Sequence, residues 1–367
     1  MSNSKRILLF IVLFSLCNEL VLGQSDNFIR GVESRFKSGF LLPHRPIMHH
    51  LLQGHSFGGE ISFIGVANGN QEWHQAFKHP KIGGKLYFSD YGNLEQLGWA
   101  VGTGFFGEFP YFRNNWLTLN TKITGGLAYV TRKFDQQLNP KNNSVSTHLN
   151  LLFTIGMNAN FLLEKGEFAV GMDMTHLSNG ATKLPNLGLN VPYLSVAYTR
   201  YIDELEFITA EREKSTFLKS MEDWHVSLLG VGSTKQIYPT GGRNYPVVSL
   251  STFLSKKVGR KAGLDFALEF FYNESVGDTE NASPEANFWD IAQIGAYAGY
   301  FLPVNKLRIA FGMGYYLKND FNPDGPLYHR LSIRYKLNPR FDIHFGIKSH
   351  WGRADYFEYG LMYRVFG

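Results

Sequence analysis

A histidine and a serine two positions apart, His176 and Ser178, are the side chains of this sequence best suited to chemistry. In a β-strand, residues two apart point to the same face, so a potential base and a potential nucleophile would be presented together. The residues before them alternate, and the face that carries the pair is apolar. Its members are Phe168, Val170, Met172 and Met174, and the opposite face holds Ala169, Gly171, Asp173 and Thr175. In a barrel that crosses a membrane, such a stripe faces lipid.

An asparagine fourteen residues after the histidine, Asn190, is the expected third member of the site. It begins another alternating run, whose more apolar face carries Pro192, Leu194, Val196 and Tyr198. Adjacent antiparallel strands bring residues of one face to within about 5 Å of each other, which allows Asn190 to bond His176. The backbone N–H groups at Asn179 and Gly180 are the expected oxyanion donors. No group of His, Asp and Glu has the spacing of metal ligands, so we expect neither a metal nor another cofactor.

Alternation of apolar and polar residues also dominates the second half of the chain. It runs through residues 264–272, 308–317, 330–337 and 357–365, with one face apolar and the other more polar and often charged. Strands that cross a membrane need such a pattern, because lipid covers one side and a polar interior the other. A soluble sandwich would also bury an apolar face, but so many charges on the second face favour a polar lumen. The predicted fold class is therefore all-β, a transmembrane antiparallel β-barrel.

Short and long connections between the predicted strands alternate. Short ones fall near residues 164–167, 259–261, 303–305 and 338–340, and long ones near 132–145, 179–189, 274–287 and 318–327. Short turns in such barrels are periplasmic and long loops extracellular, so the strand of His176 should end at the outer surface. The rhythm gives about 16 strands. We expect them to form one barrel, because tandem closed barrels in one chain are uncommon; two tandem eight-strand barrels are the alternative.

The expected boundaries divide the chain into four parts. Residues 1–23 have the basic start, apolar middle and small-residue end of a signal peptide. Residues 24–202 hold the first half of the strands with the His176 motif, 203–221 form a charged connection, and 222–367 hold the second half.

The composition favours a membrane barrel and argues against nucleic-acid binding. Aromatic residues make up 15% of the chain, which has 38 Gly and a single cysteine, Cys17, inside the expected signal peptide. The net charge of +5 is too mild and too scattered for a nucleic-acid partner. No later stretch reaches the ~18 consecutive apolar residues of a membrane-spanning helix. We expect an integral protein of the bacterial outer membrane whose partner is membrane lipid; its oligomeric state is open.

Two other motifs contain histidine. His350 shares its face with Asp342, His344 and Lys348, opposite Phe341, Ile343, Phe345 and Ile347. It should therefore point into the lumen, within a polar network that includes Glu358 and Arg364. Trp73–His74 falls in an expected periplasmic connection, where no chemical role follows from the sequence.

The stretch from His176 to Gly188 resembles the motif of the lipid A 3-O-deacylase (acyloxyacyl hydrolase) family of outer-membrane barrels. The residues that carry the resemblance are His176, Ser178, Asn179, Gly180, Lys183, Pro185, Asn186 and Gly188. Weaker similarities to the longer members of the family, from Bacteroidetes-type bacteria, lie at Gly39–Arg45, Trp73–His74, His79–Pro80 and His350–Asp355. The resemblance covers most of the chain and implies an outward-facing esterase that removes the 3-linked acyl chain of lipid A. It implies that His176 is the general base and Ser178 the nucleophile.

Asn190 departs from the short members of that family, which have a glutamate at this position. An asparagine can accept a hydrogen bond from His176 and fix its tautomer, but it cannot stabilise the imidazolium by charge. The Ser–His–Asn set resembles outer-membrane phospholipase A, whose His-x-Ser-Asn-Gly motif has the same spacing to its asparagine. Lipid A deacylation is the expected function, with a phospholipase or a non-catalytic porin as alternatives. The ester cleaved and the preferred acyl-chain length stay open.

Overall fold

The computed structural model describes residues 28–203, 223–279, 282–283, 285–321 and 324–366. Strands make up most of these residues and pair in two separate closed sheets. Among the residues so described, no helix is long and apolar enough to cross a membrane. The expected signal peptide and, apart from Asp203, the expected charged connection lie outside the described residues.

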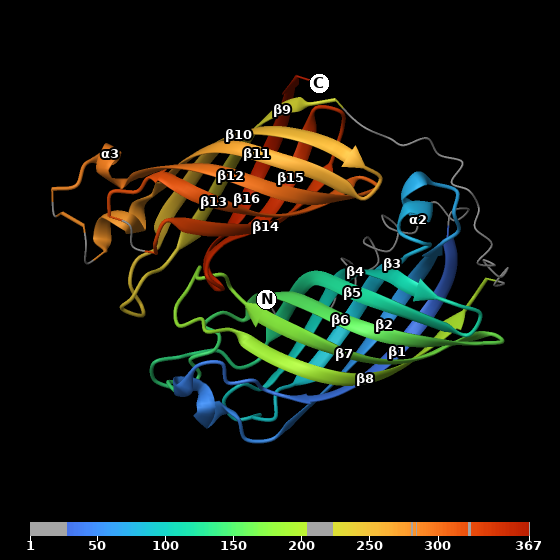
Figure 1. Ribbon diagram of the computed structural model, residues 1–367. Helices are drawn as coiled ribbons and strands as arrows, with labels where there is room; N and C mark the ends of the chain where they lie inside the picture. The colour runs from blue at the N-terminus through green and yellow to red at the C-terminus, as the bar shows by residue number, and fades with distance from the viewer. Residues whose placement is uncertain (1–27, 204–222, 280–281, 284, 322–323, 367) are drawn as a thin grey trace. The chain divides into compact units, whose positions relative to one another are not determined.

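The first sheet is a closed antiparallel barrel of eight strands, blue to green in Figure 1. Its strands are β1 (Phe28–Phe40), β2 (His55–Ala67), β3 (Lys81–Asp90), β4 (Trp99–Arg113), β5 (Leu117–Val130), β6 (Leu149–Leu163), β7 (Gly166–Ser178) and β8 (Leu189–Tyr201). Each strand pairs with its neighbours in sequence, and β1 also pairs with β8, from Gly31 opposite Tyr201 to Gly39 opposite Tyr193. Closure satisfies the backbone hydrogen bonds that lipid cannot.

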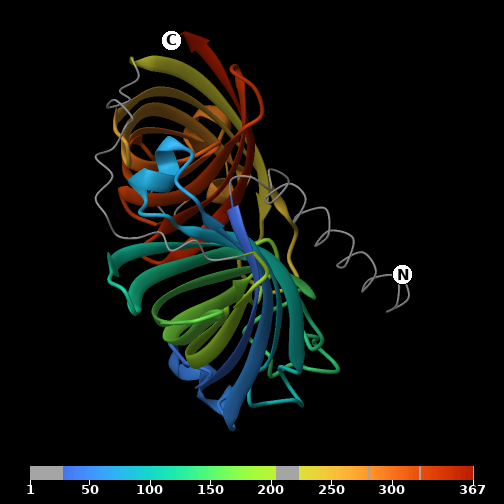
Figure 2. The ribbon, with the colours of Figure 1, turned by 90° about the vertical axis from the view of Figure 1, so that its right-hand side faces the viewer.

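The second sheet is another closed antiparallel barrel of eight strands, yellow to red in Figures 1 and 2. Its strands are β9 (His225–Lys235), β10 (Tyr245–Gly259), β11 (Ala262–Asn273), β12 (Ala292–Val304), β13 (Leu307–Lys318), β14 (Leu327–Lys336), β15 (Phe341–His350) and β16 (Arg353–Phe366). The barrel closes where β16 pairs with β9, with Tyr359 opposite Gly232 and Arg364 opposite Ser227.

The strand number agrees with the sequence prediction, but the expected closure is wrong. The described residues form two barrels of eight strands rather than one wide barrel. Two tandem barrels are the alternative that the sequence analysis stated. Alternation along a strand shows which face is apolar, but it does not show which distant strand completes the sheet. The pairing of β1 with β8 settles the closure, because it leaves the first eight strands no free edge for β9.

The two faces of the strands follow the predicted alternation. On β7, Phe168 and Met172 are exposed on the outside of the barrel. Asp173 and Thr175 point the other way, where both accept hydrogen bonds from the ammonium group of the buried Lys37. Apolar side chains on the outer wall contact acyl chains in a bilayer, so their exposure in the isolated chain carries no cost there.

Charged side chains fill the lumen of the first barrel. Lys37 Nζ lies 3.2 Å from Glu60 Oε1 and 2.8 Å from Asp173 Oδ1, and Lys85 Nζ lies 2.7 Å from Glu60 Oε1. A cavity of about 10 Å³ beside these groups has barely the space for one water molecule. Eight strands enclose an interior that side chains can fill, so the described part of this barrel is packed rather than open.

The lumen of the second barrel also contains paired charges. Arg330 Nε lies 2.7 Å from Glu358 Oε2, its Nη1 lies 2.5 Å from Glu269 Oε1, and all three side chains are fully buried. Arg334 Nη1 lies 2.8 Å from Asp265 Oδ2. Pairing compensates the desolvation of these buried charges, so the loss of one partner would leave the other charge buried and unpaired.

Helical segments occupy the connections. In the first barrel, η2 (Pro46–Leu51) and the β7–β8 connection lie at one end, and α2 (Glu72–Ala76) lies at the other (Figure 1). In the second barrel, η3 (Glu274–Asp278) and α3 (Phe288–Ile291) belong to the long β11–β12 connection. By the rule that long loops are extracellular, β7 ends at the extracellular rim.

Candidate active site

His176 and Asn190 face each other across β7 and β8 at the extracellular end of the first barrel. The register places the two residues directly opposite, and His176 Nδ1 lies 2.6 Å from Asn190 Oδ1. An amide oxygen can only accept, so the imidazole donates its Nδ1–H and carries its basic lone pair on Nε2. Both side chains are half-buried. The structure therefore contains the contact that strand alternation predicted.

Ser178 is the last residue of β7 and lies on the same face of the strand as His176. It pairs with Leu151 of β6 and is only 5% exposed. Alternation predicted the face on which Ser178 lies, and on that ground we expected it on the exposed outer wall. In the structure it is buried, because loops pack around the end of the strand, and alternation does not include such packing. One such packing contact lies beside it, where Asn179 Nδ2 donates to Ser146 Oγ at 3.0 Å.

A second histidine, His44, lies beside the site, in the connection after β1, the strand that pairs with the other edge of β8. It follows β1, and its Nδ1 lies 2.9 Å from Asn190 Nδ2. The backbone nearby is also joined, since the Leu42 N–H donates to the Asn190 carbonyl oxygen at 2.8 Å. The Asn190 amide thus accepts from His176 and donates to His44. Sequence reasoning included His44 in a softer similarity and gave it no role, although closure of the barrel at β8 would have placed it here.

Gly188, in the β7–β8 connection, packs directly against the His176 ring. Its φ is +80°, a conformation that L-residues with side chains rarely adopt. A Cβ at this position would lie 2.6 Å from His176 Cε1. The Gly188 N–H donates to the Ser144 carbonyl oxygen at 2.8 Å, which ties the glycine to the β5–β6 connection. Glycine is therefore required here both for the backbone conformation and for the close contact with the imidazole.

The expected oxyanion donors lie in the same group of loops. The Asn179 backbone N–H donates to Asn186 Oδ1 at 3.2 Å, and Gly180 has a φ of +61°. An oxyanion bound at this place would have to replace Asn186 as the acceptor of the Asn179 N–H. The hydrogen bond from Asn179 Nδ2 to Ser146 Oγ does not involve the backbone N–H, so it can hold Asn179 in position while the N–H binds an oxyanion.

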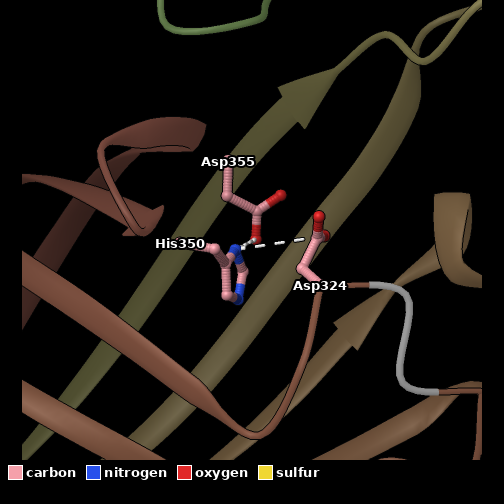
Figure 3. Close-up of side chains that lie close together, drawn as sticks. All are labelled: Asp324, His350 and Asp355. Carbon is pink, nitrogen blue, oxygen red and sulfur yellow. Dashed lines mark ion pairs between the residues drawn. The ribbon is translucent and has the colours of Figure 1, made fainter.

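A histidine and two aspartates, from β15, β16 and the β13–β14 connection, lie close together in the second barrel (Figure 3). His350 Nδ1 is 3.9 Å from Asp324 Oδ2 and 3.8 Å from Asp355 Oδ2. These groups have the types of metal ligands, but Asp355 is also paired with the ammonium groups of Lys235 and Lys348. The two ammonium groups balance the two carboxylates, so the cluster has little net attraction for a metal cation.

His350 is buried on the lumen face, as alternation predicted, but its expected partners are wrong. Its Nε2 lies 3.2 Å from the Tyr316 hydroxyl, whereas Glu358 binds Arg330 and accepts from His344 Nε2 at 3.1 Å. Arg364 is only half-buried near the opposite end of β16. His350 lies beside the turn that joins β15 to β16, opposite Arg353, whereas Glu358 lies opposite Gly346. Distance along the hairpin therefore separates His350 from both expected partners, and alternation, which reports only the face of a residue, does not include this distance.

The Trp73–His74 motif has a structural role in α2. His74 is fully buried, and its ring lies 4.3 Å from that of Trp73 and 5.3 Å from that of Phe28, measured between centroids. Burial lowers the pKa of His74 to about 4. The ring is therefore neutral at physiological pH and packs as an aromatic side chain.

Two family models match the chain. The model described as "Lipid A 3-O-deacylase (PagL)" matches residues 58–199, which include His176, Ser178 and Asn190. The model described as "Acyloxyacyl hydrolase, C-terminal domain" matches residues 223–367. The chain belongs to the lipid A 3-O-deacylase family. The first match runs from within β2 to β8, without β1, and the second covers β9 to β16, so the two matches fall in different barrels.

Membership of this family means that the protein is a hydrolase of acyl esters that acts in lipid A deacylation. It is an integral barrel protein of the outer membrane. No curated protein matches the deacylase significantly. Among solved structures, Acinetobacter baumannii Omp33 matches at 8% identity, covering 92% of this chain and 99% of its own, with a TM-score of 0.19. A mutant Rh. blastica porin matches at 9% identity, covering 92% and 100%, with a TM-score of 0.21. At such TM-scores, neither structure adds to the description of the fold.

Proposed function

We propose that the deacylase hydrolyses the 3-linked acyl ester of lipid A, with Ser178 as nucleophile, His176 as general base and Asn190 as the residue that orients the imidazole. The observation that carries the proposal is the 2.6 Å contact between His176 Nδ1 and Asn190 Oδ1, beside a serine on the same face of β7. A site on the outer face of a strand can reach the ester while the acyl chain stays in the bilayer. The 3-position rests on the matched family.

In the first half of the reaction, Ser178 Oγ attacks the ester carbonyl carbon and its proton passes to His176 Nε2. The negative charge on the former carbonyl oxygen is stabilised by backbone N–H groups at Asn179 and Gly180. The tetrahedral intermediate then breaks its bond to the sugar oxygen, which takes the proton from His176. The products are the free sugar hydroxyl and an acyl ester on Ser178.

In the second half, a water molecule gives one proton to His176 Nε2 and attacks the acyl-serine carbonyl. The new intermediate expels Ser178 Oγ, which recovers the proton, and the fatty acid leaves. Asn190 holds the Nδ1–H side of His176 in both halves, so that Nε2 faces the reacting atoms each time. It contributes orientation without charge, so we expect a slower reaction than a carboxylate at this position would support.

A phospholipase activity is the second candidate, because the asparagine at position 190 gives the Ser–His–Asn set that resembles outer-membrane phospholipase A. Orientation of the base by an amide serves any carboxylic ester equally, so the triad geometry does not select between lipid A and a glycerophospholipid. A porin function has no comparable support, because paired charges occupy the lumen in the described parts of both barrels.

The test is release of fatty acid by the purified, folded deacylase in detergent micelles, from lipid A and separately from phosphatidylethanolamine. Ser178→Ala removes the nucleophile, and Ser34→Ala, at an exposed serine on the outer face of β1, is the matched control. We expect wild type and Ser34→Ala to release the 3-linked chain of lipid A and Ser178→Ala to release none. Mass spectrometry of the product locates the cleaved ester.

The outcomes separate the candidates. Release from phosphatidylethanolamine alone would replace the lipid A proposal with the phospholipase. Equal release by wild type and Ser178→Ala, with both proteins showing the heat-modifiable mobility of a folded barrel, would overturn the serine mechanism.

A further inference from the structure

The side chain of Asn190 contacts two histidines, and the second one comes from a different strand. Asn190 Oδ1 lies 2.6 Å from His176 Nδ1, and Asn190 Nδ2 lies 2.9 Å from His44 Nδ1. His44 is separated from Asn190 by 146 residues and is exposed, whereas Asn190 is half-buried. We propose that His44 is a positioning residue of the deacylase, which acts by fixing the orientation of the Asn190 amide. The inference rests on the function proposed above.

The need for a positioning residue follows from the chemistry of an amide. A carboxylate presents two equivalent acceptors, so either oxygen can receive the Nδ1–H of an imidazole. An amide has one face that only accepts and one that only donates. Rotation of the Asn190 side-chain amide by half a turn would present Nδ2 to His176 in place of Oδ1.

That rotation would place the wrong tautomer in the site. With Nδ2 as its neighbour, His176 would have to accept at Nδ1 and carry its proton on Nε2. Nε2 would then have no lone pair to take the proton of Ser178. Loss of the correct tautomer is the reason that an amide in place of the triad carboxylate can be costly in serine hydrolases.

His44 selects the productive orientation because its Nδ1 accepts. Asn190 Nδ2 can only donate, so its 2.9 Å contact with His44 Nδ1 assigns His44 the tautomer whose lone pair is on Nδ1, and Asn190 Oδ1 is left for His176. The backbone bond from the Leu42 N–H to the Asn190 carbonyl oxygen, 2.8 Å long, holds the two segments together beside this contact. His44 therefore keeps an acceptor oxygen of Asn190 directed at His176 Nδ1–H, which a carboxylate at position 190 would do without a second residue.

The first experiment replaces His44 and measures kcat and KM separately on lipid A micelles. His44→Ala removes the acceptor, and we expect kcat to fall on the order of ten- to a hundredfold with KM within about threefold of wild type. His44→Gln keeps an acceptor oxygen and should recover most of the rate. His49→Ala, at an exposed histidine of the same connection, is the control and should leave both constants unchanged.

The second experiment combines the change with Asn190→Asp, which supplies two acceptors. In that background His44→Ala should change kcat by less than about threefold, because a carboxylate has no orientation to lose. A double-mutant cycle then shows strong coupling between positions 44 and 190.

Three results would overturn the proposal, in addition to full activity of His44→Ala. They are a loss in His44→Ala that persists undiminished in the Asn190→Asp background, a rise in KM with kcat unchanged, and His44→Gln no more active than His44→Ala. Failure of the serine mechanism is distinguishable, because it shows as full activity in Ser178→Ala. Full activity in His44→Ala together with an inactive Ser178→Ala removes only the role of His44.

Discussion

Gly188→Ala should inactivate the deacylase without unfolding it. The substitution has two effects that can be separated. Holding alanine at a φ of +80° costs about 1–2 kcal/mol. The new Cβ would also lie 2.6 Å from His176 Cε1, while unstrained carbon atoms approach to about 3.5 Å. The imidazole must therefore move by roughly 1 Å, and a misplacement of that size in a catalytic group can lower the rate about a hundredfold.

The chain offers a control with the same backbone conformation. Gly352 has a φ of +79°, and a Cβ there would meet nothing within 4 Å. Gly352→Ala thus carries the backbone strain without a steric contact. We expect both variants to lose similar stability in a heat-modifiability series and only Gly188→Ala to lose about a hundredfold in kcat. If Gly188→Ala stays within a few-fold of Gly352→Ala in kcat, the position of the His176 ring does not limit the reaction and our account of the site is wrong.

Arg330→Met should destabilise the second barrel by about 3–5 kcal/mol, because Glu269 and Glu358 stay buried without the guanidinium they share. The midpoint of heat-induced mobility change measures this loss, and an unchanged midpoint would mean that water reaches both carboxylates. Asn190→Glu should raise the initial rate of fatty-acid release, since a carboxylate stabilises the imidazolium; a fall would show that the longer side chain displaces His176. Asn190→Ala should reduce that rate by roughly ten- to a thousandfold, and a rate equal to wild type would show that the ring needs no partner at Nδ1.

Much of the fold and part of the site could be predicted from the sequence. Alternation is a local property, so it identified the outward face of β7 and placed His176 opposite Asn190, as the register has them. It also placed His350 in a lumen. The burial of Ser178 could not be predicted in this way, because it depends on how loops fold over a strand end.

The wrong closure and the missed contact of His44 have one cause, which is that barrel closure is a long-range property. In a single barrel of about 16 strands, β1 would pair with the last strand of the chain and His44 would lie far from Asn190. The closure of eight strands on themselves brings β1 beside β8 and His44 to the Asn190 amide. The expectation of one wide barrel therefore concealed the third side chain of the hydrogen-bonded group.

The contact between Asn190 and His44 spans the line where the first and last strands of the barrel meet. During biogenesis, a chain that has paired β7 with β8 already holds His176 against Asn190, but His44 arrives only when β1 docks. The hydrogen-bonded group of His176, Asn190 and His44 is therefore complete only in the closed barrel. Closure of the sheet and completion of the site are the same structural event.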